Sequence, residues 1–237
     1  VLIQMDDHRW LAAEAHAFVP YPDALKQDLL ALQQIGENEL HRSQMLAQQL
    51  SRLYAEAVNL LLAEQNLQPA DIRAIGCHGQ TIRHAPEAGY SIQIGNLALL
   101  AELTGIFTIG DFRSRDLAAG GQGAPLVPAF HQALFGDNSQ TRVTLNIGGI
   151  ANISVLPPDA PAFGFDTGPG NMLIDQWIEA HTGKAFDKGG RTAAGGSVVA
   201  SLVARYMESP FFSANIRRCH FQTSMQGVHF ADEIAQE

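Results

Sequence analysis

The chain has 237 residues, and its 24 acidic side chains outnumber its 15 lysines and arginines, giving a formal net charge of −9. A hydrophobic share of 46% and a charged share of 16% describe a folded globular protein and exclude a disordered one. The acidic balance argues against a nucleic-acid surface, and no apolar run approaches the ~18 residues that span a bilayer. A secreted disulfide scaffold would carry more than two cysteines, and no C-x-x-C pair is present, so we expect reduced thiols in a cytoplasmic protein without a cysteine-based metal site.

The first half of the chain predicts a strand followed by a long helix. Residues 1–5 are strand-like and begin abruptly without a methionine, so we expect further chain upstream. A helix is predicted over 37–65, because apolar residues recur there every three or four positions and so share one helix face. They are Leu46, Leu50, Leu53, Ala57 and Leu60. We expect this face to pack in the core.

The remainder of the chain alternates between short strand-like runs and helical patterns. The strand-like runs cover residues 72–77, 91–94, 106–109, 143–147, 150–156 and 163–165. Helices are predicted over 97–104, over 172–178 with Gly183 ending the pattern, and after a Ser197 cap as far as Tyr206. Strands mixed with helices predict an α/β fold.

A hairpin is predicted where Gly148 and Gly149 separate two strand-like runs. A Gly-Gly pair suits the positive φ angles of a two-residue turn. Glycines also let backbone N–H groups approach a phosphate closely. A plain hairpin and a phosphate-binding hairpin both remain open.

Four clusters of polar and glycine residues follow strand-like runs, at residues 76–81, 110–113, 120–125 and 165–171. Ligands of open α/β sheets collect beyond the carboxyl ends of strands, so we expect the clusters to converge on one cleft. Their His, Gln, Asn, Thr and Asp side chains suit the hydroxyl groups of a ligand. The sequence contains no G-x-S-x-G nucleophile, H-E-x-x-H metal motif or Walker-type phosphate loop.

Three carboxylates and one histidine are the individual candidates. Asp166 follows an apolar strand and precedes a rigid turn, which suits a general base, although aspartate is also common as a turn former or helix cap. Asp111 and Asp116 are second candidates for the general base. The alternative is that they form surface charge pairs with the nearby Arg113 and Arg115. His78 stands among polar donors and is a candidate ligand contact.

Six longer motifs stand in the order and spacing of one protein family. They are G-C-H-G-Q-T at 76–81, Q-I-G at 93–95, D-F-R at 111–113, A-G-G-Q-G-A-P-L-V-P-A-F-H at 119–131, N-I-G-G-I-A-N at 146–152 and F-D-T-G-P-G-N at 165–171. Over roughly residues 1–212 the chain closely resembles anhydro-N-acetylmuramic acid kinase, a family of bacterial peptidoglycan-recycling enzymes.

The resemblance implies a two-lobed actin/hexokinase-like (ribonuclease H-like) fold, incomplete at both ends. Residues 1–118 would form a first lobe that lacks its first strand and phosphate loop, and residues 119–237 would begin the second lobe. The implied partners are ATP, Mg²⁺ and a small amino sugar, without nucleic acid or membrane. A homodimer is left open.

The resemblance also implies an activity and its residues. The family uses ATP and water to open the 1,6-anhydro ring and phosphorylate O6, which yields N-acetylmuramic acid 6-phosphate. Asp166 matches the family's catalytic aspartate, and no side chain is expected to ligate a metal. The implied sugar-binding residues are His78, Gln80, Thr81, Asp111, Arg113, Gln122 and Asn171. The implied nucleotide-binding residues are Asn146, Gly148, Gly149 and Asn152.

The sequence departs from the family pattern in several places. The family's G-T-S-x-D-G phosphate loop and its later G-G-G adenosine motif have no counterpart in this sequence. From Ser213 onward the sequence diverges from the family pattern, and Asn96 stands where the family usually has an aspartate. An alternative reading is therefore a catalytically inactive fragment or remnant that binds amino sugar only. A third interpretation is a regulatory sugar-binding module. Such a module would require a basic DNA-binding segment, which the sequence does not show.

Overall fold

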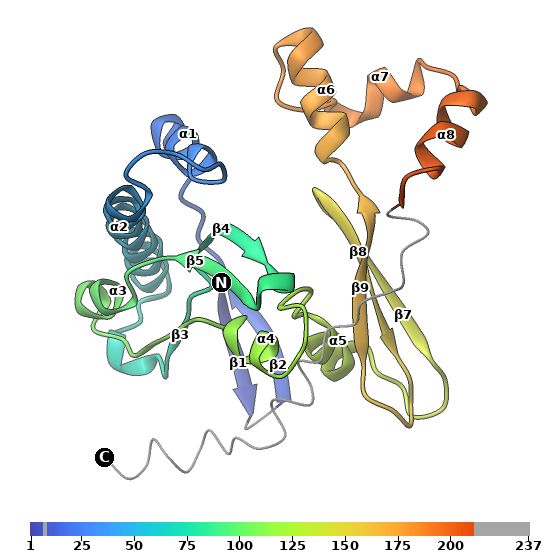
Figure 1. The fold of residues 1–237 in the computed structure, drawn as a ribbon. Coiled ribbons are helices and arrows are strands. Elements are labelled where there is room, and N and C mark those ends of the chain that lie inside the picture. The colour runs from blue at the N-terminus through green and yellow to red at the C-terminus, as the bar shows by residue number, and fades with distance from the viewer. Residues whose placement is uncertain (7–8, 211–237) are drawn as a thin grey trace. The chain divides into compact units, whose positions relative to one another are not determined.

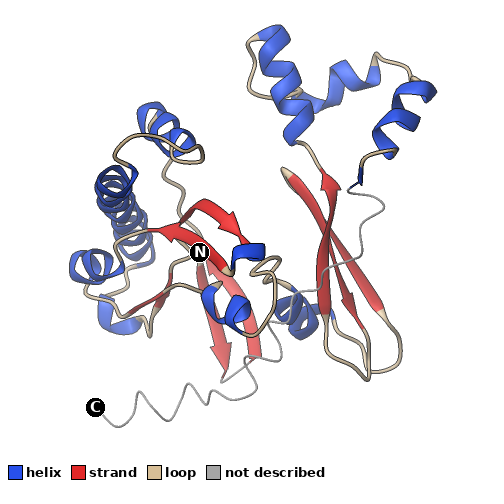
Figure 2. Ribbon diagram, viewed as in Figure 1, coloured by secondary structure: helices blue, strands red, loops and turns tan. Residues whose placement is uncertain are grey.

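The computed structural model describes residues 1–6 and 9–210, and the chain divides into two compact units, Val1–Gly123 and Ala124–Glu237. Helices and strands occur in both units, which confirms the predicted mixture of α and β structure (Figures 1 and 2). Among the helices of these described residues, none has the length and apolar character needed to cross a membrane. The assignment of 1–118 and 119–237 as two kinase lobes stays a prediction.

Three small sheets make up the strands of the first unit. β1 (Leu2–Asp6) and β2 (Arg9–Ala15) form one antiparallel pair, and β4 (Gln80–Ala85) and β5 (Tyr90–Ile94) form another. β3 (Ile75–Gly76) and β6 (Thr108–Ile109) pair in parallel. The strand predicted over 72–77 is observed only at Ile75–Gly76, after a 3₁₀ turn (Pro69–Asp71) and a short connection. The strand β4 was not predicted, since its first residues read as a polar cluster.

Four helices accompany these sheets. They are α1 (Asp23–Ala31), α2 (Glu39–Gln65), α3 (Leu97–Thr104) and the short α4 (Ser114–Ala118). The helix predicted over 37–65 is confirmed as α2. Both of its ends carry an asparagine in the left-handed region, with φ of 55° at Asn38 and 54° at Asn66, which asparagine tolerates better than most residues.

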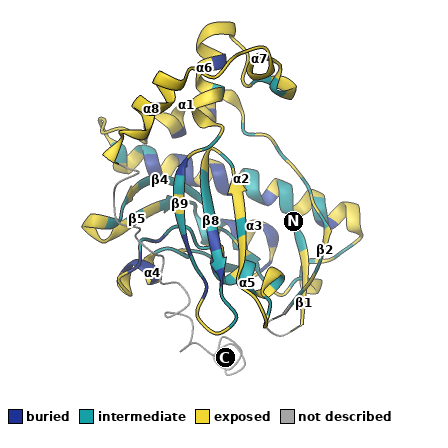
Figure 3. Cartoon of the chain, turned by 90° about the vertical axis from the view of Figure 1, so that its right-hand side faces the viewer, coloured by how far each residue is buried: buried dark blue, intermediate teal, exposed yellow. Residues whose placement is uncertain are grey.

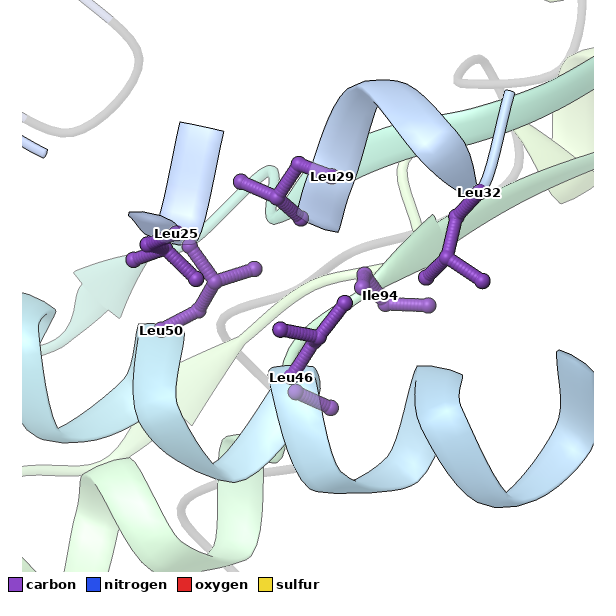
Figure 4. Close-up of a cluster of buried hydrophobic side chains, with 7 residues drawn as sticks. Leu25, Leu29, Leu32, Leu46, Leu50 and Ile94 are labelled. Carbon is purple, nitrogen blue, oxygen red and sulfur yellow. The ribbon is translucent and has the colours of Figure 1, made fainter. Parts of the chain in front are cut away.

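The core of the first unit lies between α1, α2 and β5 (Figure 4). Its buried members are Leu25, Leu29, Leu32, Leu46, Ala47, Leu50 and Ile94. The predicted core face of α2 is thus confirmed at Leu46 and Leu50. It is wrong at Leu60, which is 41% exposed, because the buried stripe passes through Ala55 and Leu62 in the C-terminal half of the helix.

The second unit is built on an antiparallel sheet of three adjacent strands, β7 (Arg142–Ile147), β8 (Ile150–Leu156) and β9 (Phe163–Pro169) (Figure 1). Helix α5 (Pro128–Phe135) packs against β8 and β9. Gly164 permits this approach, because a Cβ there would lie 2.7 Å from Cγ of Pro128.

Three further helices follow the sheet, α6 (Met172–Thr182), α7 (Arg191–Ala194) and α8 (Ala200–Met207). Most of their residues are exposed (Figure 3). Gly183 ends α6 in the left-handed conformation, with φ of 69°, as predicted. The predicted Ser197 cap is wrong, because α8 begins three residues later after Val199.

Candidate functional site

A pocket of about 350 Å³ in the first unit brings two of the predicted clusters together. β3 and β6 are parallel neighbours, so the residues that follow them emerge at the same edge. His78 follows β3 and Asp111 follows β6, and both line the pocket. Gln93 of β5 and Ser114 of α4 also line it. Neither was predicted individually, although Gln93 belongs to the Q-I-G motif.

Asp111 sits in an unusual backbone conformation at the pocket wall. Its φ is 55°, in the left-handed region that aspartate visits more readily than most residues. The hydroxyl of Ser114 donates a 2.6 Å hydrogen bond to its Oδ1. The exposed carboxylate is thereby oriented by the first turn of α4.

Both ring nitrogens of His78 are engaged within the protein. Nε of Arg113 donates to His78 Nε2 at 2.9 Å, and His78 Nδ1 lies 2.9 Å from the carbonyl oxygen of Gly79. The guanidinium of Arg113 also donates to the carbonyl oxygen of Gly123. The side chain of Arg113 therefore joins the pocket wall to the glycine-rich loop at 120–123.

Asp116 is fully buried and holds the same loop. Its Oδ2 accepts a 2.7 Å hydrogen bond from the backbone N–H of Gly123, and its carbonyl oxygen accepts one of 2.8 Å from Gly121. A Cβ at Gly121 would collide with the Asp116 carboxylate, so only glycine fits there. Paired surface charge is consequently the wrong interpretation of Asp116.

The remaining predicted sugar residues of this unit lie outside the pocket lining. Gln80 and Thr81 are half-buried at the start of β4, where Nε2 of Gln93 donates to Thr81 Oγ1 at 3.2 Å. Gln122 is half-buried in the loop that Asp116 and Arg113 hold. Their roles toward a ligand stay predictions.

In the second unit, a row of polar residues crosses the sheet. Asn146 of β7 pairs with Asn152 of β8, which pairs with Asp166 of β9. Residues directly opposite one another share a face of the sheet. Asp166 is exposed, and Asn152 Oδ1 is buried without a hydrogen-bond partner among the described residues. The row thus presents a carboxylate beside an amide oxygen that lacks a donor.

A bulge follows Asp166. The pairing of β8 with β9 shifts between Ala151 and Asn152, which leaves Thr167 as the extra residue. Gly168 has a φ of 133°, a conformation that favours glycine. Bulges are common beside active sites, where they redirect a side chain.

The turn between β7 and β8 differs from the prediction. Three residues separate the paired Ile147 and Ala151, and neither Gly148 nor Gly149 has φ in the left-handed region. The two-residue turn with positive φ is therefore wrong, although the hairpin is confirmed. A Cβ at Gly148 would meet no atom closer than 3.8 Å, so packing does not require glycine at that position.

This turn is joined to the start of α6. The carbonyl oxygen of Gly148 accepts a 2.8 Å hydrogen bond from the N–H of Asn171, and that of Gly149 accepts one of 2.9 Å from Gly170. A Cβ at Gly170 would collide with the Gly148 carbonyl oxygen, so this close contact requires glycine. The predicted nucleotide turn and the end of the Asp166 motif therefore form one connected structure.

His131 fixes α5 to the face of the sheet that carries the polar row. Its Nδ1 lies 2.8 Å from Ser154 Oγ and 2.9 Å from Thr144 Oγ1. Thr144 and Ser154 are paired across β7 and β8, two residues along each strand from the pair of Asn146 and Asn152. Burial lowers the pKa of His131, so the folded protein holds it neutral more readily than the unfolded chain does.

We expect the second unit to lose stability on acidification because of His131. The unfolded chain takes up the proton first, near its ordinary pKa of ~6.5, so the contribution is complete above that pH and declines below it. Urea unfolding at pH 7.5 and 5.5, followed by Trp177 fluorescence in a Trp10→Phe background, measures this. His131→Gln should reduce the difference in unfolding free energy between pH 7.5 and pH 5.5. An unchanged difference would contradict the assignment.

Among residues 1–6 and 9–210, no group of three or more His, Cys, Asp or Glu side chains could hold a metal ion. Cys77 is a free thiol, and burial raises its pKa. The second cysteine, Cys219, lies outside the described residues.

Comparison with known proteins points to one family. The family model for anhydro-N-acetylmuramic acid kinase matches residues 1–222. Proteins of that name from Neisseria meningitidis serogroup C (strain 053442) and Neisseria gonorrhoeae (strain ATCC 700825 / FA 1090) are each 67% identical over 213 residues, covering 90% of this chain and 58% of the relative. One from Chromobacterium violaceum is 54% identical with the same coverage. The chain thus spans about 58% of the length of these relatives. It belongs to the anhydro-N-acetylmuramic acid kinase family.

Proposed function

We propose that this chain supplies a sugar pocket and the catalytic carboxylate of an ATP-dependent kinase. The kinase would open the 1,6-anhydro ring of anhydro-N-acetylmuramic acid and phosphorylate O6, as part of peptidoglycan recycling. The observation that carries the proposal is the exposed Asp166 in one row with Asn152 and Asn146, next to the glycine turn. Family membership supports the choice of reaction.

Asp166 would act as the general base. Its carboxylate takes a proton from water while the water oxygen bonds to C1 of the sugar, and the C1–O6 bond breaks. The freed O6 is then the acceptor of the phosphoryl group. General-base assistance of this kind contributes typically ~10²–10⁴-fold to the rate. When bound, ATP supplies the γ-phosphoryl group and Mg²⁺ neutralises its charge.

The residues of the second unit fit a phosphate group. The space beside Gly148 and Gly149 is open, since an added Cβ would meet nothing closer than 3.7 Å at either position. The buried Oδ1 of Asn152 lacks a hydrogen-bond donor among the described residues, and as an acceptor it suits a hydroxyl or N–H group of the nucleotide and not a phosphate oxygen. We assign Asn146, Gly148, Gly149 and Asn152 to the nucleotide side.

In the first unit, His78 and Asp111 would form the sugar-facing wall, with Gln80, Thr81, Arg113 and Gln122 around it. Asn171 lies in the second unit, and its role toward the sugar stays a prediction. Sugars are recognised through hydroxyl groups, for which carboxylate and amide oxygens are suitable acceptors. The two-lobed actin/hexokinase-like arrangement, a cytoplasmic location and a homodimer also stay predictions.

A coupled assay for ADP release tests the function. It would contain ATP, Mg²⁺ and the anhydro sugar, with the chain alone and with the chain extended by the remaining segments of a Neisseria relative. Turnover by the extended form supports the proposal. Sugar binding without ADP release from either form would favour the amino-sugar-binding alternative.

Gly148→Val is expected to weaken nucleotide binding by ~10-fold or more while sugar affinity stays nearly unchanged. The valine side chain fills the open space at the turn, where a phosphate would approach the backbone. Calorimetry on the extended form measures both affinities. Gly196→Val is the matched control, because Gly196 also lacks a left-handed φ and lies between α7 and α8. Equal nucleotide affinity in the two variants would contradict the assignment of the turn.

A further inference from the structure

The contacts of Arg113 determine which nitrogen of His78 carries the proton. A guanidinium has only N–H donors and cannot accept a hydrogen bond. Because Arg113 Nε donates to His78 Nε2 at 2.9 Å, that nitrogen must present its lone pair. The proton of the neutral ring is then on Nδ1, which lies 2.9 Å from the carbonyl oxygen of Gly79 and donates to it.

This tautomer is the opposite of the one that free neutral histidine favours in water. With both nitrogens engaged, His78 offers the pocket the edge and face of its ring, not an acid or a base. The imidazole is therefore suited to shape the pocket wall.

The same arginine holds the glycine-rich loop. The carbonyl oxygen of Gly123 accepts from Arg113, while the N–H of Gly123 donates to Asp116 Oδ2 at 2.7 Å. Gly123 has a φ of 68°, so the loop turns in a conformation that favours glycine. Two charged side chains at α4 thus fix both polar groups of Gly123, immediately after Gln122.

We propose that Arg113 is a positioning residue that locks His78 as the neutral Nδ1–H tautomer and couples this pocket wall to the loop carrying Gln122. The proposal deepens the proposed function, because it assigns the way in which the sugar-facing wall is organised. Its first test needs no sugar and no turnover. Failure of the kinase proposal and failure of this one can therefore be told apart.

The experiment is ¹⁵N-edited NMR of the histidine rings in the chain, with the His78 signals identified by their loss in His78→Gln. In the unsubstituted chain, Nδ1 should have the shift of a protonated nitrogen and Nε2 that of an unprotonated one. Arg113→Met should move the population to predominantly Nε2–H. Arg115→Met, at the neighbouring exposed arginine of α4, is the matched control and should leave the tautomer unchanged.

Calorimetry with the anhydro sugar provides the second measurement. Loss of the fixed wall in Arg113→Met should weaken binding ~10-fold, the size of one net hydrogen bond. An Nε2–H tautomer in the unsubstituted chain would overturn the proposal without any variant. An unchanged tautomer in Arg113→Met would also overturn the proposal. If the tautomer were unchanged but sugar affinity fell, Arg113 would be a direct sugar contact.

Discussion

Asp166→Asn is expected to lower turnover by ~10²-fold or more while sugar affinity and fold are kept, because the amide cannot accept the proton of the attacking water. Asparagine has nearly the same shape as aspartate, and position 166 is exposed within β9, so the pairing with Asn152 should persist. The measurement is the rate of ADP release by the extended form at saturating ATP and anhydro sugar, beside sugar affinity by calorimetry.

Asp159→Asn is the matched control for this variant. Asp159 is an exposed carboxylate in the connection between β8 and β9, at the opposite end of these strands from the glycine turn. The same chemical change there should leave turnover within about twofold. Near-normal turnover in Asp166→Asn would remove Asp166 from the mechanism. A loss of the same size in both variants would point to charge in general and not to a general base.

Leu50→Ala is expected to destabilise the first unit by about 2–5 kcal/mol, the usual range when a fully buried leucine is truncated. Leu50 is 0% exposed and packs with Leu46 and Ile94 in the cluster between α1, α2 and β5 (Figure 4). The alanine leaves a cavity that this cluster fills only in part. Urea unfolding followed by Trp10 fluorescence in a Trp177→Phe background measures the loss in the first unit.

The same helix offers a matched control, since Leu40 is 84% exposed near the start of α2. Leu40→Ala removes the same atoms and should change the free energy of unfolding by no more than about 0.5 kcal/mol. Equal effects of the two substitutions would show that the cluster does not determine stability. The cluster also bears on the pocket, because Ile94 lies on β5 next to the pocket residue Gln93.

Local patterns in the sequence determined most of the helices and strands. The period of α2, the Gly183 stop of α6 and the strand-like runs of β7 and β8 on either side of a glycine pair depend on neighbours within a few residues, so these elements could be predicted. The six motifs also determined the family, which the comparisons confirm over residues 1–222. The strand β4 was missed because its polar first residues pair with β5 across the hairpin, and the local pattern of residue types does not record this pairing.

Only the tertiary structure decided how the candidate residues are held. The sequence places Arg113, Asp116 and His78 near ligand-binding motifs. The structure shows that Asp116 is buried under the glycine loop and that Arg113 joins His78 to Gly123. Likewise, glycine is required at Gly170 by the carbonyl of Gly148, while the space beside Gly148 stays open. These roles arise from contacts between segments far apart in the chain or from the path of the backbone, and neither is recorded in the spacing of residue types.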